Sequence, residues 1–185
     1  MDILEKEIED LIWDSLTDEG SNELYLRGFP KSDYYLRQFD LGSYGIADLI
    51  GVTISASHFI SINIYELKRG EVNIKTLLQA ARYEKGIRSF IIQNFNILPE
   101  KISFHLYLIG KRIDTSSDFC YLIDVFDNLT ILTISLDIVN GLKFRNRPPV
   151  FIKNPRPVSC STDTQLILLE SFKNSIKNKN GKTAF

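Results

Sequence analysis

Three charged side chains stand at the ends of two neighbouring apolar segments in this chain of 185 residues. Asp48 lies in the segment GIADLIGV, and Glu66 and Lys68 lie in INIYELKRG. Two carboxylates can share a divalent cation such as Mg²⁺, and a lysine beside them can steer an attacking water molecule. The combination suits hydrolysis of a phosphodiester bond, so these three residues are the first candidates for a catalytic site.

Residue parity indicates which side chains share a face, because side chains alternate between the two faces of a β-strand. In one segment Glu66 and Lys68 share even parity with the apolar residues Ile60, Ile62 and Ile64. In the other segment Asp48 shares its parity with Ile46, Ile50, Val52 and Ile54. We expect both carboxylates to emerge where a helix covering this apolar face ends. Leu67 points the other way, and its backbone carbonyl is a candidate for a further oxygen ligand of the metal.

The spacing of apolar residues predicts the elements that position these groups. Helical spacing predicts an amphipathic helix over residues 3–16, followed by a loop over 17–33. Three β-rich segments with turn signals between them predict a meander over 34–41, 46–54 and 58–68. A second helix is predicted over 73–90, with strands over 102–113 and 128–138. Downstream, 141–158 are predicted to form a proline-rich extended connector and Thr164–Asn178 a short helix.

The second predicted helix has two distinct stripes. The apolar stripe consists of Ile74, Leu77, Leu78 and Ala81. A separate stripe, about 100° or more away, consists of Lys75, Gln79, Arg82, Tyr83 and Gly86. We expect the first stripe to pack on the sheet and the second to look toward the metal site. Lys75 and Arg82 could then meet phosphates, and Gln79 and Tyr83 could hydrogen-bond DNA or the lysine region. The alternative is that this second stripe is only a solvent-exposed face of the helix without a binding role.

Composition favours a single domain. The length and an apolar content of 44% are enough for one core, so we expect a domain over 1–150 and a basic extension over 151–185 packed on it. No apolar run approaches the roughly 18 residues that a membrane span needs, and the N-terminus is acidic. Cys120 and Cys160 are isolated, which indicates neither a zinc site nor a disulfide framework. We therefore expect a cytoplasmic protein with no membrane partner.

The charge is distributed unevenly although the net charge is −1. Residues 141–185 carry nine Lys or Arg and two acidic residues, a net +7, which leaves −8 over 1–140. A basic segment attached to an acidic body suggests an electrostatic hold on a polyanion such as DNA. A solubilising tail is the alternative.

Taken together, the motifs resemble the PD-(D/E)XK nuclease superfamily. The pattern is Asp48, then Glu66-Leu67-Lys68, then Gln79-x-x-x-Tyr83, and it is most similar to the branches with a QxxxY element, the RecB-like and NucS-like nucleases. The likeness spans about residues 5–90. It implies a restriction-endonuclease-like core of order α-β-β-β-α-β, with a central mixed sheet flanked by helices. The proline that usually precedes the first aspartate is replaced by Ala47.

The resemblance implies roles for the individual residues. Asp48 and Glu66 are then metal ligands, together with the Leu67 carbonyl, and Lys68 orients or activates the water. The family often adds a glutamate from the first helix, for which Glu5 is the first choice and Glu9, one turn later, the reserve. Periodicity alone does not choose between them, because both flank the apolar stripe.

The expected function is therefore a Mg²⁺-dependent deoxyribonuclease that cuts internally, with Mn²⁺ able to substitute. The alternative is a catalytically inactive module of the same fold that binds DNA or assembles with other chains. The last predicted helix leaves a related question open. Its apolar positions Leu166, Leu169, Phe172 and Ile176 could form a homodimer seam or dock on the same domain.

Overall fold

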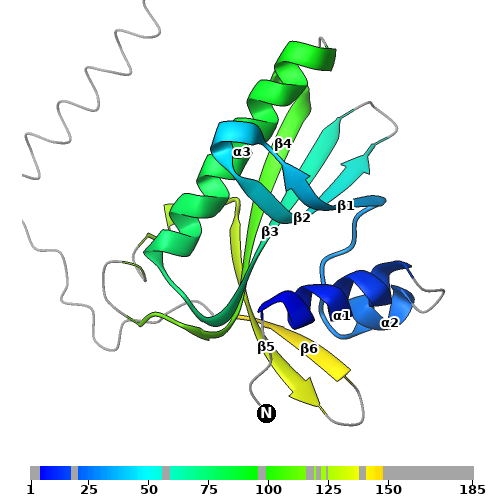
Figure 1. The fold of residues 1–185 in the computed structure, drawn as a ribbon, viewed down its shortest axis with the longest axis vertical. Coiled ribbons are helices and arrows are strands. Elements are labelled where there is room, and N and C mark those ends of the chain that lie inside the picture. Colours follow the sequence, from blue (N-terminus) through cyan, green and yellow to red (C-terminus); the bar gives the residue numbers. More distant parts are fainter. Residues whose placement is uncertain are drawn as a thin grey trace, which may run out of the picture. The chain divides into compact units, whose positions relative to one another are not determined.

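The protein is an α/β protein with a six-stranded mixed sheet packed against helices (Figure 1). The computed structural model describes residues 5–147, except 18–20, 56–58, 96–98, 116–118, 120, 121, 124 and 138–140. In chain order, the elements are α1 (Glu5–Thr17), α2 (Ser21–Leu26), β1 (Tyr34–Asp40), the 3₁₀ turn η1 (Gly42–Tyr44), β2 (Ile46–Ile54), β3 (Ile60–Val72), α3 (Ile74–Phe95), the 3₁₀ turn η2 (Pro99–Lys101), β4 (Ile102–Ile113), β5 (Leu129–Asp137) and β6 (Gly141–Asn146). The predicted order of a helix, three strands, a helix and further strands is confirmed.

The strands lie in the sheet in the order in which they occur in the chain. The first three form the predicted antiparallel meander, β4 joins β3 in parallel, β5 joins β4 in parallel, and β6 returns antiparallel to β5. The long helix α3 makes the crossover that a parallel β3–β4 pair requires. The central strand β3 is therefore hydrogen-bonded on both sides and carries the Glu-x-Lys motif toward its C-terminal end.

Two apolar cores cover opposite faces of this sheet. On one face Ile62, Ile64 and Leu108 pack against α3, and on the other Tyr65, Leu67 and Ile109 pack with α1 and α2. Every residue from 62 to 67 of β3 is buried, as expected for a strand covered on both sides. Within the described residues, no helix is both long and apolar enough to cross a membrane.

Three sequence predictions were wrong. Residues 141–146 form β6, which pairs with β5, where a connector was expected. A short helix, α2, interrupts the predicted loop 17–33. On α3 the buried stripe is rotated relative to the prediction: Leu78 is 63% exposed, whereas Ala80 and Tyr83 are buried. The helix packs on the sheet with a different face because the ring of Tyr83 is apolar enough to lie in the core. The predicted helix Thr164–Asn178 and the whole extension 151–185 lie outside the described residues.

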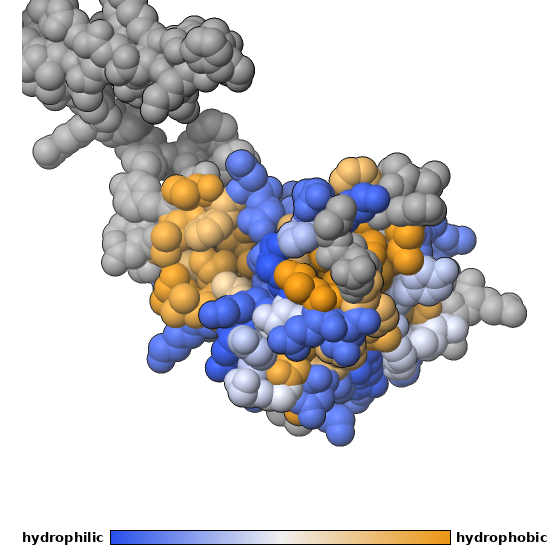
Figure 2. Space-filling model, turned by 90° about the horizontal axis from the view of Figure 1, so that it is seen from above, coloured by the Kyte–Doolittle hydropathy of each residue, from blue (hydrophilic) through white to orange (hydrophobic). Residues whose placement is uncertain are grey.

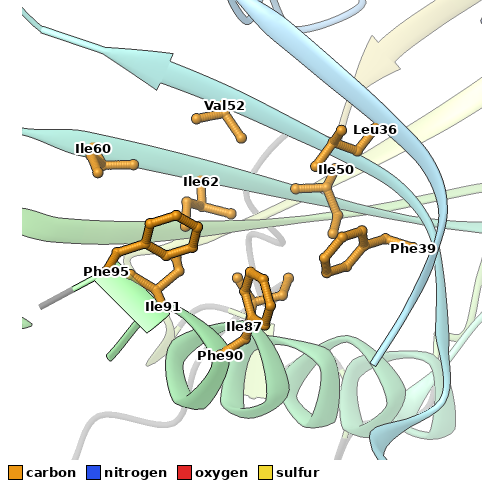
Figure 3. Close-up of a pocket in the computed structure, with 10 residues that line it drawn as sticks. All are labelled: Leu36, Phe39, Ile50, Val52, Ile60, Ile62, Ile87, Phe90, Ile91 and Phe95. Carbon is orange, nitrogen blue, oxygen red and sulfur yellow. The ribbon is translucent and has the colours of Figure 1, made fainter. Parts of the chain in front are cut away.

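An apolar pocket of about 260 Å³ lies between the C-terminal half of α3 and the first three strands. Its lining includes Ile50 and Ile62 from the sheet and Phe90 and Phe95 from the helix, and the side chains converge as Figure 3 shows. The surface in Figure 2 carries groups of hydrophobic residues among hydrophilic ones. All the described residues that line this pocket are apolar.

Gly51 provides a test of the close packing between β2 and the residues before β1. A Cβ at this glycine would lie 2.8 Å from Ser32 Cβ and 3.1 Å from Tyr65 Cε2. We expect Gly51→Ala to lower the free energy of unfolding by about 1–3 kcal/mol because the surrounding side chains must shift. Gly70→Ala is the matched control, since a Cβ there meets no atom within 4 Å. Urea unfolding measures both, and equal stability of the two variants would contradict the described packing.

Candidate active site

Asp48 and Glu66 meet where β2 and β3 separate. The last antiparallel pair on this side is Leu49 with Tyr65, so the same register would set Asp48 opposite Glu66. The ladder stops there, and the backbone N–H of Leu67 donates a hydrogen bond of 3.1 Å to Asp48 Oδ2. The pairing of β2 with β1, on its other side, is also interrupted at this point. Arg37 pairs with Leu49 and Phe39 with Ala47, but no pair joins Gln38 to Asp48.

Glu66 is the most unusual side chain of the site, because it is fully buried. Lys68 Nζ lies 2.5 Å from Glu66 Oε1 as an ion pair. Within the described residues neither Glu66 oxygen has a partner in hydrogen-bonding geometry. Burial, followed by the charge of Asp48, raises the pKa of Glu66 to about 7, although Lys68 acts in the opposite direction. Such a carboxylate is poorly satisfied by the protein alone and is suited to accepting a proton or a cation.

Asp48 is shifted in the same direction. Burial raises its pKa to about 6, while the hydrogen bond from the Leu67 amide and the charge of Lys68 partly offset this effect. Two neighbouring acids with raised pKa values are a common feature of catalytic and metal-binding sites.

Lys68 completes this charged group. Burial lowers the pKa of its ammonium, but the close ion pair with Glu66 and the charges of Glu5 and Asp48 outweigh burial, so the net shift is upward. Lys68 is therefore positively charged near neutral pH. It can orient a water molecule or stabilise negative charge, but it is not available as a base in this state.

The structure places the two helix glutamates differently. Glu5 Oε1 lies 3.5 Å from Lys68 Nζ, and Glu5 Oε2 accepts a hydrogen bond of 3.2 Å from the Arg69 amide. Glu9 is buried and lies 2.6 Å from Arg37 Nε. Both Glu9 oxygens also accept from Gln38 Nε2 at 2.8 Å. Glu5 is thus the helix carboxylate beside the lysine, whereas Glu9 is held by β1.

The network around Glu9 was not predicted from the sequence. Arg37 bridges Glu9 and Asp10, and its guanidinium carbon lies 6.0 Å from the centre of the Trp13 ring. Gln38 adopts φ = 49°, and among the described non-glycine residues it is alone in having a positive φ. The adjacent polar pair Arg37-Gln38 inside a strand was an available signal, because regular alternation would bury one of them. These residues, with Glu5, Lys6, Glu9, Asp10 and Asp48, line an open cleft of about 820 Å³.

The Gln-x-x-x-Tyr pair of helix α3 lies near the turn before Asp48. Gln79 Nε2 lies 2.7 Å from the hydroxyl of the buried Tyr83. A Cβ at Gly45, which has φ = 98°, would lie 3.2 Å from Tyr83 Cε1 and 3.4 Å from a guanidinium nitrogen of Arg82. Tyr83 and Arg82 therefore lie against the turn that leads into Asp48. Arg82 and Lys75 are both exposed on this helix.

The donor set fits a hard divalent cation in part. Asp48 and Glu66 supply carboxylate oxygen, which Mg²⁺ and Mn²⁺ prefer, and the unsatisfied Glu66 oxygens have capacity for a ligand. Among the described residues, no group of three or more His, Cys, Asp or Glu is arranged to hold a metal. Glu5, the nearest further carboxylate by its contacts, is engaged by Lys68 and the Arg69 amide.

Comparisons with known proteins add no further information about the site. No protein-family model, curated protein or solved structure matches this chain significantly.

The raised pKa values of Asp48 and Glu66 predict an unusual dependence of stability on pH. Between about pH 4.5 and pH 7, the folded protein holds protons that the unfolded chain has released, so the free energy of unfolding should fall as the pH rises through this range in metal-free buffer. Glu66→Gln should remove about half of the fall, because Asp48 keeps its own raised pKa, and should make the protein more stable than wild type at pH 8 by about 1–3 kcal/mol.

The control is Glu100→Gln, which alters an exposed glutamate. Urea unfolding at several pH values in EDTA measures the effect. A wild-type stability that does not change from pH 5 to pH 7.5, or that changes equally in Glu66→Gln, would contradict the prediction.

Proposed function

We propose that this protein is a Mg²⁺-dependent DNA endonuclease of the PD-(D/E)XK type. The observation that carries the proposal is the fully buried Glu66, paired with Lys68 and coupled to Asp48 where two central strands separate. A purely structural ion pair would not need a second, partly buried acid beside it. Proteins maintain such costly groups mainly where they bind a cation or perform chemistry.

The order of elements supports the same assignment. Helix α1, the meander β1–β3, helix α3 and strand β4 reproduce the α-β-β-β-α-β order of a restriction-endonuclease-like core. The strands β5 and β6 extend the sheet beyond β4. The Glu-x-Lys motif lies on the central strand β3, and the aspartate lies on the strand paired antiparallel to it.

In the proposed reaction, Asp48, Glu66 and the Leu67 carbonyl would hold Mg²⁺, with Mn²⁺ able to replace it. The bound ion supplies Lewis-acid activation of the phosphoryl group and of water. Lys68, which remains an ammonium, positions the attacking water and stabilises charge that develops on the phosphate. Glu5 contacts Lys68 and thereby keeps it in place. Gln79 and Tyr83 support the turn before Asp48, and Lys75 and Arg82 contact DNA.

A second candidate is the inactive module that binds DNA without cutting it. The absence of a group of three metal-ligating side chains among the described residues favours this alternative. So does the position of Lys68, which already neutralises Glu66 as metal would. Cation binding separates the two functions, because only the nuclease needs a metal at the carboxylates. A cytoplasmic location and a homodimer remain part of the proposal.

Substitution of Lys68 tests catalysis directly. We expect wild type to nick and linearise supercoiled plasmid with Mg²⁺ or Mn²⁺ and not with EDTA. Lys68→Ala should reduce the rate by at least about 100-fold, because a charge that stabilises the transition state is lost. Lys85→Ala, at an exposed position on α3, is the control and should cut like wild type. Full activity of a folded Lys68→Ala variant would rule out the assigned site.

Metal binding is tested by thermal unfolding. Millimolar Mg²⁺ or Mn²⁺ should raise the Tm of wild type by several degrees, because a ligand that binds only the folded state stabilises it by mass action. Asp48→Asn should not respond, although it keeps the shape of the side chain. An equal rise in Asp48→Asn would show that the cation binds elsewhere, and no rise in wild type would favour the inactive module.

A further inference from the structure

A second pocket, of opposite charge to the carboxylate cleft, lies at the C-terminal end of β3. Arg69, Gly70, Lys111 and Arg112 line it, and its volume is about 470 Å³. Arg69, Lys111 and Arg112 are all exposed, so three cationic side chains surround one hollow. None of these three cations was among the candidate site residues predicted from the sequence.

An irregularity between β3 and β4 creates this pocket. Lys68 is in register with Gly110 and Glu71 with Arg112, so Arg69 and Gly70 together face Lys111 alone. This two-against-one arrangement is a β-bulge, which twists a strand and redirects its side chains. A Cβ at Gly110 would lie 2.8 Å from Val72 Cγ2 and 3.0 Å from the Gly70 carbonyl oxygen. Gly110 thus allows the bulged strand to approach β4 closely.

The bulge is joined directly to the candidate active site. Arg69 follows Lys68 in the chain, and its amide donates to Glu5, which also contacts the Lys68 ammonium. Residues of a strand advance by about 3.3 Å each, so the pocket begins one residue beyond Lys68. A DNA strand carries one phosphate per nucleotide, so a strand with one phosphate beside Lys68 has neighbouring phosphates for the pocket to bind.

We propose that Arg69, Lys111 and Arg112 bind the phosphodiester backbone next to the reacting phosphate. This inference rests on the proposed nuclease function and extends it by naming the site that holds the substrate strand. Two acids lie nearby, since Glu71 is in register with Arg112 and Glu5 binds the Arg69 amide, yet the residues that line the hollow carry three positive charges and no negative one. Arginine and lysine contacts of this kind position DNA without reading its sequence.

Gly70 offers the cleanest test, because a Cβ there meets no atom within 4 Å and its φ lies outside the left-handed region. Gly70→Asp adds a negative charge to the pocket, and Gly70→Asn adds a neutral side chain of the same shape. Fluorescence anisotropy with a labelled duplex in EDTA measures binding without cleavage. We expect Gly70→Asp to weaken binding roughly tenfold and Gly70→Asn to bind nearly as wild type does. Equal affinities of the two variants would overturn the proposal.

A triple variant tests the cations themselves. Arg69→Gln, Lys111→Gln and Arg112→Gln together should reduce the slope of log K against log salt by about 2 to 3, since each phosphate contact contributes about 0.9. The control combines Lys31→Gln, Lys85→Gln and Lys101→Gln, which removes the same charge from exposed or half-buried positions outside the pocket. An equal change of slope in both triple variants, or none in the pocket variant, would overturn the proposal.

Plasmid cleavage by wild type, run in parallel, separates this inference from the nuclease assignment. If wild type cuts DNA and the pocket variants bind normally, the DNA-binding role of the pocket is overturned and the nuclease assignment is kept. If wild type binds but does not cut, and the pocket variants lose affinity, the pocket stands as a DNA-binding site and the catalytic assignment fails. If wild type shows no salt-dependent binding, both are overturned.

Discussion

The buried carboxylate of Glu66 is the constraint on which the rest of the site depends. Glu66 is wholly inaccessible to solvent. Moving a charged carboxylate out of water costs free energy, which only close ion pairs, hydrogen bonds or a bound cation can offset. Lys68, two residues along the same strand, offsets part of this cost. The part of the cost that is not offset raises the pKa of Glu66 to about 7, so that near neutral pH the carboxyl group is divided between its protonated and charged forms. The fold therefore presents an acid whose charge is poised for a cation.

Holding such a group requires a rigid surrounding, and the two cores provide it. The neighbours of Glu66 on β3, Tyr65 and Leu67, are buried in the core formed with α1 and α2, while Ile64 belongs to the core formed with α3. The strand cannot rotate or slip without exposing one of these cores, because a shift of one residue would exchange its two faces. At the same point β2 separates from β3, and the Leu67 amide turns to Asp48. The apolar packing thus fixes where the two acids meet.

The sequence was sufficient for the order of elements but not for their details. Alternation and helical spacing are local signals, so α1, the meander, α3 and β4 could be predicted. The prolines that follow residues 141–146 led to the prediction of a connector in place of β6. Leu142 and Phe144 nevertheless alternate with polar residues and are buried. The six residues of α2 are too few for a periodic signal. On α3, the buried face depends on Tyr83, whose ring packs in the core while its hydroxyl meets Gln79, and no periodicity of apolar residues reveals that dual use.

The same division separates the predicted and unpredicted parts of the site. Parity along two strands brought Asp48 and Glu66 together, because that relation follows from the period of a strand. The Glu9 network depends on Gln38 in a left-handed conformation, and the basic pocket depends on a bulge that sets two residues against one. Both are departures from regular pairing, so they become visible only when strands are placed side by side. Asp48 lines the acidic cleft and Arg69 lines the basic hollow, so both lie close to the Glu-x-Lys motif. A polyanion is attracted to the hollow but repelled by the cleft, and a divalent cation at the carboxylates would remove that repulsion. In the proposed nuclease, the irregular pairing of the strands would couple metal binding to substrate binding.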